Sequence, residues 1–196
     1  LASNGIIASE KVIQENPIDH APGDNENNVN FTLTYRVTDS NGDFVDGTLN
    51  VDVDDDTPTV SANAGAVVDD DNLAGGNTGG TGDDNPVNVS GTLAHSYGAD
   101  GGSIAFLTTG APNGFTYELS GSSLLIKQGG TTVLTISLNT STGAYSITQN
   151  NPIDHTAGDN ENNQGFAITY RVTDGDGDIL NGTLNMSGPN TTRTLT

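Results

Sequence analysis

The 196-residue sequence predicts an all-β protein made of immunoglobulin-like antiparallel β-sandwich repeats, one complete and one partial. Short runs alternate apolar and polar residues, which is the period of a strand with one buried face. Stretches rich in glycine, asparagine and serine separate these runs, as turns between strands do. A long internal repeat indicates that one structural unit occurs more than once.

The repeat is read directly from the letters. NPIDHAPGDNENN begins at Asn16, and NPIDHTAGDNENN begins at Asn151. Over positions 14–51, 25 of 38 residues are identical to the residues 135 positions later. A period of this length is too long for a solenoid repeat and fits a whole domain.

The repeat divides the chain into four parts. Residues 1–53 are predicted to be the C-terminal part of a sandwich repeat, and residues 54–60 an acidic calcium-binding linker. Residues 61–190 are predicted to form a complete repeat, followed by a tail over 191–196. What completes the first repeat is left open between a segment elsewhere in the polypeptide and another chain.

The strands are predicted in order from the alternation of apolar residues. The clearest is 166–172, where Phe166, Ile168, Tyr170 and Val172 share one face, and 31–37 repeats it. The remaining predicted strands are 87–94, 103–109, 114–119, 122–128, 134–138, 144–149 and 178–186. Residues 69–86, rich in glycine and aspartate, are predicted to be a long loop, either a flexible surface loop or one ordered by calcium.

The charge restricts the classes of partner. The chain has 25 acidic and 5 basic residues, and its formal net charge is −20. Phosphate recognition needs lysine and arginine, so nucleic acid is not expected as a partner, and an anionic membrane surface is disfavoured for the same reason. Direct insertion into a membrane is not expected, because no stretch approaches the ~20 apolar residues of a membrane span. The chain has no cysteine, so core packing or a bound metal must stabilise it. The alternative explanation of the acidity is solubility or a salty medium.

Three groups of carboxylates have a spacing that suits calcium, which takes six to eight oxygen ligands. The first is TDGDGD, with Asp174, Asp176 and Asp178, where glycines let the chain curl. The first repeat has the weaker TDSNGD, with Asp39 and Asp43. An EF-hand is not predicted, because no glutamate stands at the twelfth position, and a simple polar turn is the alternative.

The second and third groups lie on either side of the first strand pair. Asp54, Asp55 and Asp56 form the linker, where a divalent cation would offset their mutual repulsion. Asp19, Asp24 and Glu26 belong to the repeated NPIDH segment. His20 and His155 lie in the two copies of that segment, and each is expected to be a hydrogen-bonded structural residue.

Sandwich topology predicts that these groups meet. The loop before the last strand lies at the end of a sandwich where its first strand begins. The TDGDGD turn of the complete repeat is therefore expected to face the incoming linker, and Asp19, Asp24 and Glu26 to approach from the other side. A calcium ion at this junction would hold neighbouring domains in a stiff rod.

The motifs YRVTDGDGDILNGTLN and VDVDDDTPTV resemble the repeats of giant RTX adhesins, which Gram-negative bacteria export by type I secretion. GTLAHSYGADGG and VVDDDNL are similar to the front of the same repeat. The resemblance implies tandem immunoglobulin-like extender domains on the bacterial cell surface, outside the cell, with calcium at the joints and roles in attachment and biofilm formation. One departure is the sequence SGPNTTRTLT after Met186, which replaces the acidic linker.

The leading functional expectation is therefore a calcium-rigidified structural segment of a surface adhesin, whose partners are neighbouring repeats of the same chain. The alternative is a module that binds a glycan or a peptide, or adjacent modules that do so. The chain has no tryptophan and few other aromatic residues, which disfavours a sugar platform. Enzymatic activity is not expected, because no nucleophile elbow, phosphate loop, zinc spacing or reactive cysteine is present.

Overall fold

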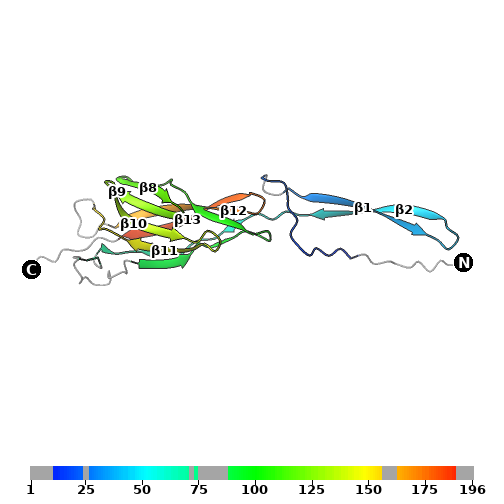
Figure 1. Ribbon diagram of the computed structural model, residues 1–196, viewed down its shortest axis with the longest axis horizontal. Coiled ribbons are helices and arrows are strands. Elements are labelled where there is room, and N and C mark those ends of the chain that lie inside the picture. The colour runs from blue at the N-terminus through cyan, green and yellow to red at the C-terminus, as the bar shows by residue number, and fades with distance from the viewer. Residues whose placement is uncertain (1–10, 24–26, 71–72, 75–87, 156–162, 189–196) are drawn as a thin grey trace, which may run out of the picture.

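The structure is a computed structural model that describes residues 11–23, 27–70, 73–74, 88–155 and 163–188 (Figure 1). These residues form strands and no α-helix, so the predicted all-β sandwich is confirmed. No helix in this part of the chain is long and apolar enough to span a membrane. The strands are β1 (Val29–Thr38), β2 (Phe44–Val53), β3 (Thr59–Val60), β4 (Ala66–Val67), β5 (Asn88–Thr92), β6 (His95–Ser96), β7 (Gly102–Phe106), β8 (Phe115–Ser120), β9 (Ser123–Gln128), β10 (Thr131–Leu138), β11 (Ala144–Gln149), β12 (Gln164–Asp174) and β13 (Ile179–Gly188).

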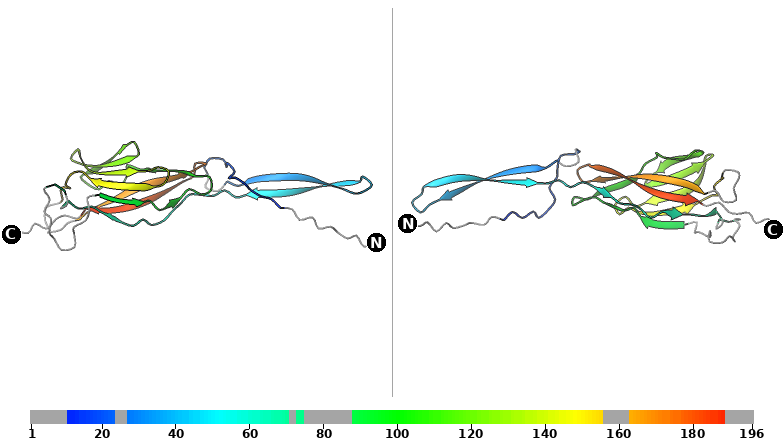
Figure 2. Two further views of the ribbon diagram at one scale, coloured as in Figure 1. Left: turned by 60° about the horizontal axis from the view of Figure 1, so that its bottom comes forward. Right: turned by 180° about the vertical axis from the view of Figure 1, so that it is seen from behind.

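Two sheets form the sandwich, and they lie over one another in Figures 1 and 2. One has the order β5-β11-β10-β9-β8, and the other has the order β4-β13-β12-β7. Sequential strands are joined by tight hairpins, as at Ser120↔Ser123 and Gln128↔Thr131. β4 is an exception to the antiparallel pattern, because it pairs in parallel with the end of β13 at Met186↔Ala66.

The inward-facing residues of both sheets make one apolar core. Leu124, Ile126, Leu134, Ile136 and Ile147 of the five-stranded sheet are fully buried. From the other sheet, the face of β12 predicted from its alternation is buried against them. Phe115 and Phe166 join the two sheets through an edge-to-face contact with ring centroids 5.0 Å apart.

Tyr170 lies in the middle of this core and ties several segments together. Its ring is fully buried over Gly182, the residue opposite it on β13. Its hydroxyl accepts a hydrogen bond from Asn63 Nδ2 at 2.8 Å, and Asn63 Oδ1 accepts one from the Ala94 N–H at 2.7 Å. The buried hydroxyl is therefore paired, as a buried polar group must be.

Among the described residues, the strands of the first repeat are those of the hairpin β1–β2, which extends from one end of the sandwich (Figures 1 and 2). We call this end of the sandwich the junction end. The register of the hairpin, with Tyr35 opposite Gly47, reproduces that of β12–β13, with Tyr170 opposite Gly182. The apolar face of the hairpin is exposed, however, and Tyr35 is 45% accessible where Tyr170 is 0% accessible.

The linker between the hairpin and the sandwich is held in place where it enters the sandwich. β3 pairs with β6 at Val60↔His95, and Pro58 is buried. The predicted loop over 69–86 falls mostly outside the described residues, since 71–72 and 75–87 are not among them.

Candidate metal centre at the junction

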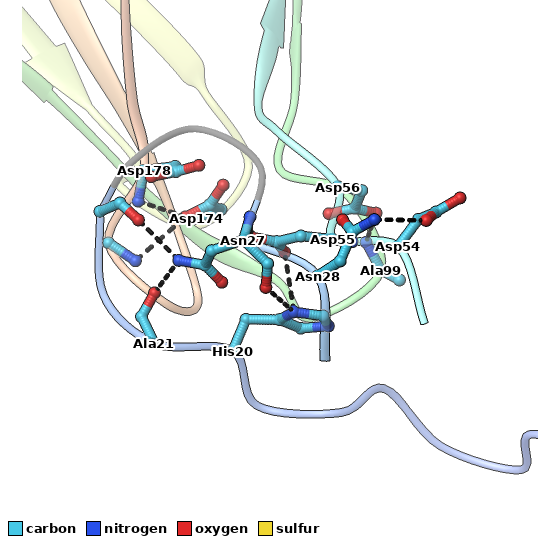
Figure 3. A network of polar contacts seen from close by, with 12 residues as sticks. His20, Ala21, Asn27, Asn28, Asp54, Asp55, Asp56, Ala99, Asp174 and Asp178 are labelled. Atoms are coloured by element: carbon cyan, nitrogen blue, oxygen red, sulfur yellow. Dashed lines mark hydrogen bonds and ion pairs between the residues drawn. The ribbon is translucent and has the colours of Figure 1, made fainter. Parts of the chain in front are cut away.

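Three segments meet where the hairpin joins the sandwich (Figure 3). They are residues 20–23 and 27–28 before β1, the linker of residues 54–56 after β2, and the turn of residues 174–178 between β12 and β13. A Cβ on Gly177 of the turn would lie 4.0 Å from Pro22 Cβ, so the first repeat comes close to the second here.

The turn between β12 and β13 is held by its own backbone. The Asp174 carboxylate accepts hydrogen bonds through Oδ1 from the Gly177 N–H at 3.1 Å and the Asp178 N–H at 2.7 Å. Gly177 has φ +106°, a conformation that favours glycine over residues with a Cβ. The sequence TDGDGD thus curls locally, and the curl brings the side chains of Asp174, Asp176 and Asp178 to one end of the sheet.

Three carboxylates from two segments converge at this point. Oxygens of Asp55, Asp176 and Asp178 all lie within 4.8 Å of one another. Asp178 is buried, and Asp55 and Asp176 are half-buried. Asp55 comes from the linker and the other two come from the turn, so a cation bound to all three would cross-link the linker to the sandwich.

Several carboxylate oxygens at this site are buried without a donor. Both oxygens of Asp176, Oδ2 of Asp174 and Oδ1 of Asp100 have no hydrogen-bond donor among the described residues. A buried ionised carboxylate without a donor or a counter-charge is costly. An oxygen-rich donor set of this kind fits a hard divalent cation such as Ca²⁺, whose ligands are carboxylates, carbonyls and water.

The other two linker carboxylates have partners of their own. Asp54 Oδ1 accepts a hydrogen bond from Asn28 Nδ2 at 2.7 Å, and Asp56 Oδ2 accepts one from the Ala99 N–H at 2.8 Å. Asp54 therefore connects the linker to the loop before β1, and Asp56 connects it to the β6–β7 loop. Both hydrogen bonds orient the linker, leaving Asp55 between them to face the turn.

His20 supports the same arrangement. Its Nδ1 lies 2.9 Å from the Asn27 carbonyl and 3.9 Å from Asp55 Oδ1. The hydrogen bond to the Asn27 carbonyl raises the pKa of His20, and the charge of Asp55 adds to that effect. This geometry is that of a hydrogen-bonded structural histidine, which holds the loop beside the linker.

Some predicted ligands lie elsewhere. Asp39 and Asp43 are at the exposed tip of the hairpin, away from the junction (Figure 1), where Asp39 Oδ1 accepts N–H bonds from residues 41–43. Asp19 is exposed and is not part of the three-carboxylate cluster. Asp24 and Glu26 lie outside the described residues.

The sequence reasoning missed Asp100. It follows β6 in the sequence YGADGG, and its carboxylate lies against Gly175 of the turn, where a Cβ would overlap it. With Asp54, Asp55 and Asp56 it lines a cavity of about 60 Å³ at the junction, which has room for an ion or a water molecule. A single aspartate between Ala99 and Gly101 carries no periodic signal, so only the folded chain reveals this neighbour.

The opposite end of the sandwich has a related contact. Asp70 accepts hydrogen bonds from Gln149 Nε2 and, at 2.9 Å, from the Ile153 N–H, and its Oδ2 lies 3.7 Å from His155 Nε2. His155 is the repeat equivalent of His20, so each NPIDH segment brings its histidine to an aspartate. In the complete repeat that aspartate belongs to the segment after β4, whereas in the first repeat it belongs to the linker.

Burial and, to a smaller extent, the neighbouring carboxyl of Asp176 together raise the pKa of Asp174 to about 6. An acid whose folded-state pKa lies above its ordinary 3.8 stabilises the fold below pH 4, and that contribution is lost as the pH rises through 6. In metal-free buffer we therefore expect the free energy of unfolding to fall as the pH rises from 4 to 7.

The measurement is urea unfolding from pH 4 to pH 7 in the presence of EDTA, for the chain and for Asp174→Asn. The amide retains the Oδ1 acceptor for the turn but cannot ionise, so the difference between the two chains isolates the carboxyl. A pH dependence that is the same in both chains would contradict this assignment. Saturating calcium should flatten the difference, because a bound cation keeps the carboxylates ionised.

A comparison with known families gives one match. The profile of a family described as a domain of unknown function, DUF5801, matches residues 65–187. No curated protein and no solved structure matches the chain. The matched residues cover β4 to β13, which is nearly the whole sandwich, and stop short of the hairpin and the linker.

Proposed function

The chain belongs to the DUF5801 family of domains of unknown function, and from the junction geometry we propose that it is a calcium-stiffened extender segment of a bacterial surface adhesin. In this proposal the protein has a structural role and no catalytic one. Its cofactor is Ca²⁺, and its immediate partners are neighbouring repeats of the same polypeptide.

The observation that supports this role is the convergence of Asp55 with Asp176 and Asp178. Two of these carboxylates belong to the sandwich, and the third belongs to the only segment that leads from the hairpin into it among the described residues. Without a cation the three like charges repel one another and favour an open junction. With a cation the attraction replaces the repulsion, so the linker is held against the turn.

The hydrogen bonds around the site favour one orientation of the linker. Asn28 and Asp54 connect it to the first repeat, while Asp56 and Ala99 connect it to the second. Each of these bonds is exposed to solvent and contributes about 1 kcal/mol or less. A structural cation adds much more than that when its ligands are preorganised, so it would decide whether the junction bends.

The cellular setting of the proposal rests on the sequence. The motifs YRVTDGDGDILNGTLN and VDVDDDTPTV resemble repeats of type I-secreted RTX adhesins. Such a protein works outside the cell, where calcium is abundant, and serves attachment and biofilm formation. A chain of rigid units would carry an adhesive module away from the bacterial surface.

The test is a distance distribution across the junction. The chain has no cysteine, so Ser40→Cys at the hairpin tip and Ser141→Cys in the β10–β11 turn provide two unique sites for spin labels. We expect pulsed electron paramagnetic resonance to give a narrow distance distribution in calcium and a broad one in EGTA. Equal widths in the two conditions would contradict the proposal.

A matched control uses the same labelled chain carrying Asp178→Asn. Removal of this ligand should leave the distribution broad at calcium concentrations that narrow it in the parent. Magnesium in place of calcium gives a second comparison, since Mg²⁺ demands a stricter octahedral geometry than a set of three carboxylates and water readily provides.

A further inference from the structure

The hairpin β1–β2 has one apolar and one polar face. The apolar face carries Phe31, Leu33, Tyr35 and Val37, of which Leu33 is 52% and Tyr35 is 45% accessible. The polar face carries an Arg36–Asp46 ion pair, with Nε and Oδ1 2.6 Å apart. A two-stranded sheet of this kind is stable only when another layer of structure packs on its apolar face.

The complete repeat shows what covers the same face when it is buried. Phe166, Ile168, Tyr170 and Val172 stand 135 residues after these four, in the same register, and all are buried. They pack against the inner face of the sheet β5-β11-β10-β9-β8. The edges of β12 and β13 are paired with β7 and β4, whereas β1 and β2 pair only with each other among the described residues.

Part of that cover is already present in the first repeat. Residues 12–18 are the repeat equivalents of 147–153, which run from the end of β11 to Ile153. They lie beside the hairpin, where Val12, Ile13 and Ile18 line an open cavity of about 470 Å³ together with Phe31 and Leu33. Val12 and Ile13 remain exposed, although Ile147, the equivalent of Val12, is buried between β5 and β10.

We propose that the apolar face of β1–β2 docks a segment of the same type as residues 59–146, which supplies strands equivalent to β3–β10 and closes a second sandwich. The complete repeat indicates where this segment lies in the chain. In the complete repeat, β10 reaches β11 through a tight turn, in which Asn139 N–H bonds the Ala144 carbonyl at 2.8 Å. The strand beside residues 12–14 is therefore expected to run directly into them in the same polypeptide.

This inference does not depend on calcium at the junction. Its physical basis is the burial of apolar area and the pairing of two strand edges, which are otherwise open to association with other chains. The calcium proposal concerns the turn of residues 174–178 and the linker, which lie at the other end of the hairpin from its tip. Either proposal can fail without the other.

The experiment places a second copy of residues 59–146 directly ahead of Val12 in the chain, because Ile147 is the repeat equivalent of Val12. Hydrogen exchange with mass spectrometry then follows β1 and β2. We expect their amides to exchange at least about 100-fold more slowly than in the original chain, approaching the rates of β12 and β13. Tyrosine fluorescence should show Tyr35 becoming protected from iodide quenching.

Two variants of the chain that carries the second copy of residues 59–146, called the extended chain, give a matched pair. Leu33→Asp places a charge on the apolar face and should abolish the protection, while Thr34→Asp places the same charge on the opposite face and should retain it. β12 and β13 serve as internal references in both. An added segment that stays unfolded, or that folds while Tyr35 remains exposed, would overturn the proposal.

The original chain tests the competing occupant. If the face instead served contact between two copies, analytical ultracentrifugation would show a dimer that Leu33→Asp dissociates and that persists in the extended chain. That result would overturn the proposal. A monomeric original chain, together with protection of the hairpin in the extended chain, would support it.

Discussion

Replacement of Asp176 by asparagine is expected to change the response of the protein to calcium in two opposite ways. In EGTA the variant should melt at a higher temperature than the parent, because it removes a buried charge whose oxygens have no donor among the described residues. In calcium it should melt at a lower temperature, because one of the three converging carboxylates is gone.

The size of the effect follows from binding linkage. A ligand present at 100 times its dissociation constant stabilises the fold by about 2.7 kcal/mol. For a chain of this length, that corresponds to a rise in melting temperature of roughly 5–10 °C in the parent. The variant should lose most of this rise, since a change to even a neighbour of a metal ligand reduces affinity by about 10–100-fold.

The chain itself provides the precedent for this substitution. Asn41 occupies the position in the hairpin turn that Asp176 occupies in the turn between β12 and β13. The variant therefore gives the second turn the Asp-x-Asn-Gly-Asp pattern of the first, without a change of length. Differential scanning calorimetry with and without calcium is the measurement.

The control for the Asp176 variant is Asp52→Asn. Asp52 is exposed on β2 close to the junction, so this change removes the same charge outside the cluster. It should leave the calcium-induced rise unchanged. If Asp176→Asn lowered the melting temperature equally with and without calcium, Asp176 would be a structural residue of the turn and not a ligand.

Substitution of Gly182 by valine is expected to have the largest effect on stability. A Cβ at this position would overlap the ring of Tyr170, which is fully buried and held through its hydroxyl by Asn63. The ring cannot move aside without breaking that hydrogen bond and the packing around it. Overpacking of this kind costs about 1–3 kcal/mol, and the lost buried hydrogen bond adds about 1–3 kcal/mol.

The matched control is Gly47→Val in the hairpin. A Cβ there would lie 2.5 Å from Tyr35 Cζ, which is the same clash. Tyr35 is half-exposed, however, so its ring can rotate into solvent, and we expect a change of less than about 1 kcal/mol. Urea unfolding of both variants measures the two costs.

A similar cost for both glycine variants would show that Tyr35 is packed in solution. In the chain extended by residues 59–146, the cost of Gly47→Val should rise toward that of Gly182→Val, because docking would bury the Tyr35 ring. The loss of stability in the two glycine variants therefore measures how well the hairpin is covered as well as how tightly the core is packed.

The turns show how far the sequence alone can determine structure. Asp39 and Asp174 each accept backbone N–H bonds from the residues that follow them, and the two turns have the same form. One turn is exposed at the hairpin tip and the other lies at the junction. The form is set by hydrogen bonds to neighbours in the sequence, so it was predicted from the alternating aspartates and glycines of TDGDGD and, more weakly, from TDSNGD.

The candidate site was predictable only in part. The order of strands in a sandwich predicts that Asp174, Asp176 and Asp178 face the linker, with Asp19, Asp24 and Glu26 on its other side. It could not separate Asp55 from Asp54 and Asp56, because all three are consecutive aspartates. Their roles differ through Asn28 and Ala99, which come from distant parts of the chain.

The sequence by itself determined most of the longer strands, the unit of repeat and the acidic turns, because each depends on residues close together along the chain. The short strands β3, β4 and β6 were not predicted, because two residues are too few to show an alternation. The tertiary structure alone decided which carboxylates meet, that Asp100 lies against the turn, and that Tyr35 is exposed where Tyr170 is buried. The two tyrosines occupy identical local sequences, YRVTD. They differ only in the sheet that covers them, and burial depends on segments far away in the sequence.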